Sequence, residues 1–341
     1  SNMTYNVYGC LDFATWNRSR NEIDLYTSSA TGNTSSLIVN VGDGTANNPG
    51  TLVLGKTINL VKSLAAQTLQ INTYQYSTIK FPYTASVSAI TATNVSWPFS
   101  LDNVNVTNTY GVSLSLTGTL AQTIVGGTIP FAAVTINNTS GNVSLSSPLS
   151  ITGALTLTAG KLLLGANNLT VGSTSSGSAT GYVVTDGAGT LTIPASAATS
   201  TLLPIGASAT SYDPVTVNAA SASNISAKVS ATLSGTANTG IYNNAKEWTL
   251  ASSAPSATLL TFKPSAEDAS VTSTLSSSIY YALIGQATGS ATYNNYNAAY
   301  ASGSYSATFS TFGSFVTGAN SLATALKNGS ENALSVFAAN K

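Results

Sequence analysis

Pairs of apolar residues that stand two positions apart recur along the middle of the chain. A period of two places both members of a pair on one face of a β-strand, so each pair predicts a short strand with one buried face. Turn-forming stretches such as NTSG, TAG and GANN separate the pairs. We therefore expect many short strands joined by tight turns. Between residues 133 and 173 the pairs are Val134/Ile136, Val143/Leu145, Leu149/Ile151, Leu155/Leu157, Leu162/Leu164 and Leu169/Val171.

This pattern repeats along the chain. The stretch AVTINNTSGNVSLSSPLSITG (133–153) aligns with ALTLTAGKLLLGANNLTVGS (154–173). A repeat of about 20 residues, built only from strands and turns, is typical of a solenoid whose coils pair in parallel. The predicted fold is all-β, a right-handed parallel β-helix. The alignment matches Val134 and Ile136 with Leu155 and Leu157, and Leu149 and Ile151 with Leu169 and Val171.

The composition changes towards both ends of the chain. Residues 1–30 hold five charged residues within positions 12–24, which predicts a polar N-terminal cap or starting strands. Coils of about 20 residues are expected over 31–240. Longer strands rich in Tyr and Phe predict a small antiparallel β-sandwich over 241–318. Residues 319–341 are expected to be a linker and the start of a tail, and 319–337 form the best helix candidate.

The composition also excludes several functions. Only 6% of the residues are charged, and 11 basic residues balance 11 acidic ones. Nucleic acid is therefore not an expected partner, because its recognition needs a basic surface. No stretch approaches the about 20 apolar residues of a membrane-spanning helix. The chain has no His, and its single cysteine, Cys10, cannot form an internal disulfide.

The acidic residues give no clear catalytic or metal site. Glu22 and Asp24 would share one face of a strand and could form a small cation site with Asp12, although a solvated cap is the favoured interpretation. Two further carboxylates, Asp43 and Asp186, stand beside Gly in turn-like sequences, as do Glu267 and Asp268 in PSAEDAS. Because His and paired carboxylates are the usual acid and base groups, we predict a protein that is not an enzyme and has no cofactor or metal.

Two kinds of binding residue remain. Tyr280, Tyr281, Tyr293, Tyr296, Tyr300 and Tyr305 crowd the predicted sandwich. Exposed tyrosines could stack on sugars or enter an interface, and the candidates are Tyr293, Tyr296, Tyr300 and Tyr305; burial in the core is the favoured alternative. Threonines at Thr91/Thr93, Thr156/Thr158 and Thr190/Thr192 suggest an ice-binding solenoid. Counted from coil to coil, these threonines do not keep one register, so ice binding is a minor alternative.

Four motifs in order resemble a known group of proteins. The run FAAVTINNTSGNVSLSSPLSITGALTLTAGKLLLGANNLTVGS resembles the β-helix repeats of large secreted proteins of Bacteroidetes. The later LLPIGASATSYDPVTV is similar to the segment that closes such arrays, and EWTL and ATFSTFGSFVTGA to strands of the following sandwich. ENALSVFAANK resembles the opening of the sorting domain used by the type IX secretion system. The resemblance implies export to the bacterial surface, and it carries no activity.

These observations favour a noncatalytic extracellular or cell-surface protein with a structural or adhesive role. The β-helix would act as a stalk that self-associates into a fibre or surface layer, or that binds other surface proteins. Glycans are a further expected partner. The alternative is a carbohydrate-binding or polysaccharide-degrading β-helix protein.

Overall fold

The computed structural model contains β-strands and no helix in the part of the chain that it describes. None of these residues forms a segment that could cross a membrane as a helix. Two compact units, Ser1–Tyr182 and Val183–Lys341, make up the chain. The described residues are 3–7, 10–12, 22–26, 36–41, 43, 45, 47, 51–53, 57–61, 68–73, 78–80, 88–93, 105–107, 112–124, 131–197, 199–235, 242–266, 280–288 and 293–321.

The first unit begins with short parallel strands in three sheets. One sheet has the order β1 (Met3–Val7), β4 (Ser36–Val41), β7 (Thr68–Thr73). A second has the order β2 (Cys10–Asp12), β5 (Thr51–Val53), β8 (Thr78–Lys80), β10 (Asn105–Thr107). The third starts with β3 (Glu22–Tyr26), β6 (Thr57–Val61), β9 (Ser88–Thr93). Each coil therefore adds one strand to each sheet, as expected for a solenoid.

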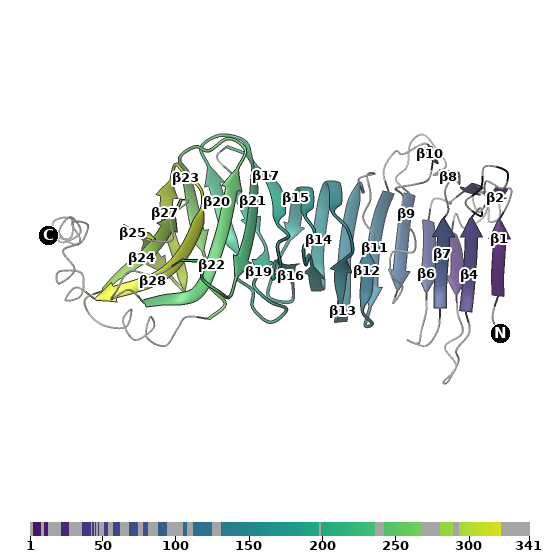
Figure 1. Cartoon of the computed structure of the whole chain (residues 1–341), viewed down its shortest axis with the longest axis horizontal. Coiled ribbons are helices and arrows are strands. Elements are labelled where there is room, and N and C mark those ends of the chain that lie inside the picture. Colours follow the sequence, from purple (N-terminus) through teal and green to yellow (C-terminus); the bar gives the residue numbers. More distant parts are fainter. Residues whose placement is uncertain are drawn as a thin grey trace. The chain divides into compact units, whose positions relative to one another are not determined.

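The third sheet continues through the repeats that the sequence pattern identified. Parallel strands follow in the order β11 (Val112–Gly118), β13 (Ala133–Leu145), β14 (Leu149–Leu163), β15 (Leu169–Ser176), and β12 (Gln122–Ile124) pairs with β13. In Figure 1 these strands stack side by side, one coil after another. The strand β14 alone contributes three segments to a coil. Residues 149–151 and 154–156 pair with different parts of β15, and residues 155–157 and 161–163 pair with different parts of β13.

The predicted matches between repeats are confirmed as direct strand partners. Val134 pairs with Leu155, and Ile136 with Leu157. In the next coil, Leu149 pairs with Leu169 and Ile151 with Val171. All eight side chains are at most 3% exposed, so apolar stripes from successive coils form one core. The parallel β-solenoid is thus confirmed for these coils.

Coil length varies more than the sequence repeat predicts. Ser36 pairs with Thr68, and Ser113 pairs with Ala133. The number of residues from Ser36 to Thr68 is more than one and a half times the number from Ser113 to Ala133. The strands themselves stay in register at both places. Strand pairing therefore does not require a constant coil length, because the connections between strands can take up the difference.

Two glycines show how closely the coils approach one another. A Cβ atom at Gly172 would overlap the backbone oxygen of Thr152 in the preceding coil. Gly160 has φ +85°, and a Cβ atom there would overlap the backbone oxygen of Asn138. At Gly160 only Gly combines a left-handed backbone with such close approach at low cost, and at Gly172 the close approach alone leaves no room for a Cβ atom. These corners of the solenoid therefore depend on Gly.

The second unit contains two antiparallel sheets. One has the order β17 (Leu191–Ala195), β21 (Ser223–Ser230), β22 (Tyr242–Ser252), β28 (Ser314–Ser321), β24 (Tyr280–Ala287), β25 (Asn294–Asn297). The other has the order β18 (Ser200–Leu203), β20 (Val215–Ala219), β23 (Thr258–Phe262), β27 (Ser304–Phe309), β26 (Ala299–Ala301). Before them, β19 (Ile205–Gly206) pairs in parallel with β16 (Gly181–Val184).

Aromatic side chains join the two antiparallel sheets. The ring centroid of Phe262 on β23 lies 5.2 Å from Trp248 on β22 and 5.2 Å from Phe315 on β28. Phe309 on β27 lies 5.0 Å from Phe315. All four side chains are at most 4% exposed. The predicted antiparallel β structure after the solenoid is thus confirmed, with an aromatic core between its sheets.

This antiparallel structure begins earlier in the chain than the predicted start at residue 241. Leu191 on β17 already pairs antiparallel with Ala227 on β21, and Ser200 on β18 pairs antiparallel with Asn218 on β20. Half-buried coils and antiparallel strands share the same period of two, so the apolar pattern does not separate them. The helix candidate at 319–337 starts inside β28, and its residues beyond 321 lie outside the described part.

Candidate binding surface

The acidic residues near the N-terminus lie in two different sheets. Glu22 and Asp24 are on β3, where they pair with Thr57 and Asn59, whereas Asp12 ends β2. The residues that the structure describes include no cluster of three His, Cys, Asp or Glu side chains suited to a metal ion. Cys10 starts β2 and pairs with Thr51.

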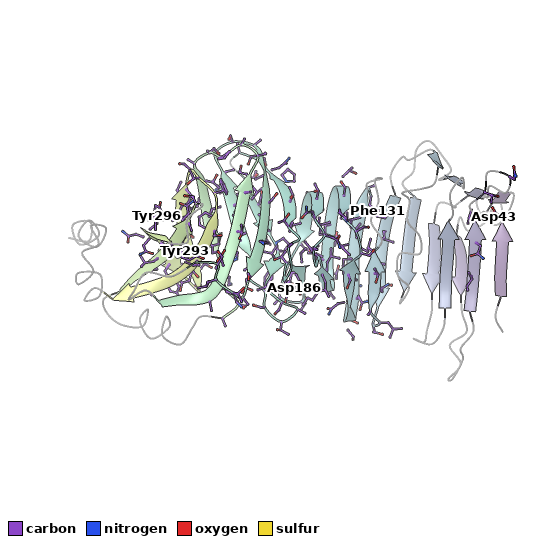
Figure 2. The ribbon with its side chains drawn as sticks, viewed as in Figure 1. Asp43, Phe131, Asp186, Tyr293 and Tyr296 are labelled. Carbon is purple, nitrogen blue, oxygen red and sulfur yellow. The ribbon has the colours of Figure 1, made fainter. Side chains whose placement is uncertain are left out.

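Two predicted turn carboxylates, Asp43 and Asp186, are exposed. Both are labelled in Figure 2. Asp43 Oδ1 accepts hydrogen bonds from the backbone N–H and the hydroxyl of Thr45, at 2.9 and 2.7 Å. This is the local turn geometry that Asp favours. Asp186 follows β16 in a loop. Glu267 and Asp268 lie outside the described residues.

The candidate tyrosines differ in exposure. Tyr293 is 1% exposed and Tyr305 is fully buried, whereas Tyr300 is half-buried with its ring 5.1 Å from that of Tyr305. Tyr296, labelled in Figure 2, is 40% exposed. Its ring packs edge-on against that of Phe309. Tyr280 and Tyr281 lie in β24, and their side chains are not among those described. Of the four candidates, Tyr296 offers the largest exposed aromatic surface.

Tyr293 instead contacts a buried carboxylate. Its hydroxyl donates to Glu247 Oε2 at 2.5 Å, and the backbone N–H and hydroxyl of Ser234 donate to the same carboxylate at 2.5 and 2.8 Å. Glu247 follows a register shift in β22 that contains Ala245 at φ 49°. The irregular backbone and the hydrogen bonds from Tyr293 and Ser234 fix the Glu247 carboxylate inside the second unit.

The surroundings of this pair change both pKa values. Burial alone would raise the pKa of Glu247, but hydrogen bonds from the Ser234 backbone, Tyr293, Ser314 and the Ser234 hydroxyl hold it below its ordinary value. Burial, followed by the hydrogen bond to Glu247, raises the pKa of Tyr293 to about 12. At neutral pH Glu247 is therefore ionised and Tyr293 is a neutral donor. The pair is suited to holding strands together rather than to exchanging protons near neutral pH.

Asp213 is a second buried carboxylate with a structural role. Its oxygens accept from the Ser265 N–H at 2.7 Å, the Ser211 hydroxyl at 2.6 Å and the Ala207 N–H at 3.2 Å. The backbone oxygen of Asp213 also accepts from Trp248 Nε1 at 2.9 Å. These bonds join the loop before β20 to the segment after β23 and to the aromatic core. Sequence reasoning did not single out this residue.

A different feature appears on the solenoid, where polar residues stand in register on successive coils. Ser115 on β11 pairs with Thr135 on β13, which pairs with Thr156 on β14. In the neighbouring row, Thr117 pairs with Asn137. Thr158 stands two residues after Thr156, beside the register shift where Asn137 pairs with Ala159. We call these six residues, Ser115, Thr117, Thr135, Asn137, Thr156 and Thr158, the polar array.

The backbone register extends the rows of the polar array by one more coil. Thr91 and Thr93 on β9 pair with Ser115 and Thr117. The prediction that the threonines lose their register is therefore wrong for Thr91 and Thr156, which stand in one row. The steps along this row differ in length, so counting by a fixed repeat misplaces them. Thr190/Thr192 belongs to the second unit, where Thr192 lies on β17.

The polar array is accessible and uncharged. Five of its side chains are half-buried and Thr158 is exposed, while the residues that alternate with them, such as Leu116, Ile136 and Leu157, are buried. Between residues 112 and 160 the sequence has no charged residue. Its one aromatic residue is Phe131, which is 3% exposed. The face therefore offers hydroxyl and amide groups without charges or exposed rings.

Hydrogen bonds fix the corner beside this array. Asn138 Nδ2 donates to the backbone oxygen of Leu120 at 2.6 Å and to Gln122 Oε1 at 2.7 Å. Its Oδ1 accepts from the N–H of Gly141 at 2.7 Å. Asn138 is fully buried and directly follows Asn137. A buried polar side chain bonded at each of these atoms strongly restricts the local backbone.

Lys161, the only charged residue between 133 and 173, also forms contacts between segments of the solenoid. Its Nζ donates to the backbone oxygens of Ala179 and Thr180, at 2.8 and 3.0 Å, and lies 4.3 Å from the ring centroid of Tyr182. Burial lowers the pKa of its ammonium group. These contacts connect one coil corner to the next.

Comparisons with known proteins add no relative to this picture. No protein-family model, curated protein or solved structure matches the chain. The proposed function therefore rests on the residues of this chain and their geometry.

Proposed function

We propose that this chain is a noncatalytic surface-binding protein. Its solenoid would hold the polar array against an extended, uncharged partner, such as a polymer or a cell-surface layer. The observation that carries the proposal is the register of Ser115, Thr135 and Thr156, because it repeats one chemical group at each coil. Repeated weak contacts of this kind gain strength through multivalency.

An extracellular or bacterial-surface location belongs to this proposal. It is supported by the charge-poor, Ser/Thr/Asn-rich sequence and by the resemblance of its repeats to secreted β-helix proteins. Self-association into a fibre or layer is compatible with it, because the formal net charge of 0 gives little repulsion between copies. Light scattering and electron microscopy over a range of concentrations would measure this self-association.

Adsorption to insoluble uncharged polymers tests the binding function. The full chain would be mixed with cellulose and chitin particles, and the bound fraction measured after sedimentation. The double variant Thr135→Lys/Thr156→Lys places two charges in the array and should reduce binding at least about 10-fold, because a buried contact would have to desolvate them. Thr152→Lys/Thr170→Lys is the matched control, since both side chains are exposed and neither belongs to the array.

Equal adsorption by both double variants would contradict the assignment of binding to the array. Absence of adsorption by the unmodified chain would remove these polymers as partners. Circular dichroism and size-exclusion chromatography would show that the variants keep the fold.

A carbohydrate-binding role in the second unit is the second candidate. The observation in its favour is the 40% exposure of Tyr296, whose ring could stack on a sugar. A glycan array probed with the full chain and with Tyr296→Ala would test it. Loss of a glycan signal in the variant supports this candidate, and an unchanged signal contradicts it.

A further inference from the structure

The spacing of the polar array is set by its backbone. Neighbouring strands of a sheet lie about 4.8 Å apart, and residues i and i+2 of one strand lie about 6.6 Å apart. Ser115, Thr135 and Thr156 therefore repeat at the first distance, and Ser115 and Thr117 stand at the second. Ser115, Thr117, Thr135 and Asn137 thus form a two-by-two lattice of polar groups, and Thr156 extends one of its rows, whereas the register shift after Ile136 leaves Thr158 outside the second row.

Its side chains have little freedom to leave this lattice. Thr is branched at Cβ, which restricts χ1 in a strand. Thr135 and Thr156 are half-buried against their neighbours, and the bonded Asn138 fixes the adjacent corner. Each Thr also presents a methyl group beside its hydroxyl. A surface with this arrangement holds its hydroxyl groups at nearly fixed positions before any ligand arrives.

The chemistry of the face restricts its ligand. Compact sites for a single protein or sugar ligand gain much of their affinity from aromatic or Arg anchors. Residues 112–160 offer neither, because they contain no charged residue and their one aromatic residue, Phe131, is buried. Charges also order liquid water around themselves and would disrupt a regular water layer. What this face can match is a ligand that repeats a small hydrogen-bonding unit in two dimensions.

We propose that the polar array binds an ordered lattice of water molecules, the surface of an ice crystal. A hydroxyl carries one donor and two acceptor lone pairs, so a Thr that already bonds to the protein can still bond to water. The inference rests on the proposed function and names its ligand. Each contact is weak, and the rows on successive coils add their contributions.

Ice recrystallisation and thermal hysteresis measure this property in the full chain. The unmodified protein should slow the growth of ice grains and shape single crystals at micromolar concentration. Thr135→Lys/Thr156→Lys should need at least about 10-fold more protein for the same effect, whereas Thr152→Lys/Thr170→Lys should behave as the unmodified chain does. If the lysine variants lose the fold, Thr135→Val/Thr156→Val keeps the branched shape and replaces each hydroxyl with a methyl group, and it should also be weaker.

The outcomes separate this inference from the proposed function. If the unmodified chain affects ice no more than an unrelated protein of the same size, the ice inference is overturned. Array-dependent adsorption to cellulose or chitin in the same preparation would then leave the proposed function standing. If the array variants still shape ice as well as the unmodified chain, the array is not the ice-binding surface and the inference also fails.

Discussion

Replacing Tyr293 with Phe should destabilise the second unit in a manner that depends on pH. The substitution removes the hydroxyl that donates to Glu247 Oε2 at 2.5 Å and leaves the ring in its buried position. A hydrogen bond to a charged group contributes about 1.5–3 kcal/mol, and a neutral one about 0.5–1.5 kcal/mol. The free energy of unfolding should therefore fall by about 2 kcal/mol at pH 7 and by about 1 kcal/mol once Glu247 is protonated.

The direction of this pH dependence follows from the pKa of Glu247, which hydrogen bonds lower in the folded state despite its burial. A lowered folded pKa contributes stability that is full above the unfolded value, about 4.3, and is lost as the pH falls through the folded value. Tyr293→Phe removes one of the bonds that lower this pKa. The difference between the two proteins should thus be largest at neutral pH and should shrink as the pH falls below the unfolded pKa, through the lowered folded pKa.

Urea denaturation followed by Trp fluorescence measures the effect. Trp248 is fully buried and adjacent to Glu247, and replacing Trp16 and Trp97 with Phe makes Trp248 the only indole reporter. With a slope of about 2 kcal/mol per M, the midpoint at pH 7 should move by about 1 M. Tyr296→Phe, at an exposed ring, is the control and should leave the midpoint unchanged. A loss of stability that stays equal from pH 7 down to the lowest pH at which both proteins remain folded would refute the role assigned to the ionised carboxylate.

Three other substitutions test the remaining structural claims. Leu155→Ala, in a fully buried position, should lower the stability of the first unit by about 2–5 kcal/mol in thermal circular dichroism, and a loss below about 1 kcal/mol would contradict its place in the core. Gly172→Ala should cost about 1–3 kcal/mol in the same assay, since the new Cβ would overlap the backbone oxygen of Thr152; unchanged melting would contradict this close approach. Asp213→Asn weakens the bonds from Ser265 and Ser211 and should lower the Trp248-detected unfolding free energy by about 1.5–3 kcal/mol; equal urea midpoints would argue against this role.

The central coils could be predicted from sequence because two independent signals agree there. The apolar pairs give the buried face, and the turn residues between them give the corners. Together they align Leu149 with Leu169 and Val134 with Leu155, and the strand register contains the same partners. A shift by one residue would have turned each apolar pair towards solvent, so burial alone selects this register.

The second unit and its tyrosines were harder to predict. Period-two alternation is the same in a coil and in an antiparallel strand, which is why the pattern assigns Leu191 to a coil although it lies on an antiparallel strand. Aromatic content does not distinguish a ligand site from a core either. Tyr293 and Tyr305 are buried, and the partner of Tyr293, Glu247, is 46 residues away in the sequence. Nothing local to either residue indicates that contact.

The polar array could have been predicted from the sequence if the coils had been aligned differently. Counting by a repeat of fixed length fails, because more residues separate Thr91 from Ser115 than separate Ser115 from Thr135 or Thr135 from Thr156. The coils can instead be aligned on their buried pairs, Leu114/Leu116, Val134/Ile136 and Leu155/Leu157. This alignment places the polar residue between the two members of each pair in one row. The buried residues fix the register because their burial supplies the energy, and the exposed residues inherit it. In a solenoid, the regularity of an exposed face is therefore best judged from the core beneath it.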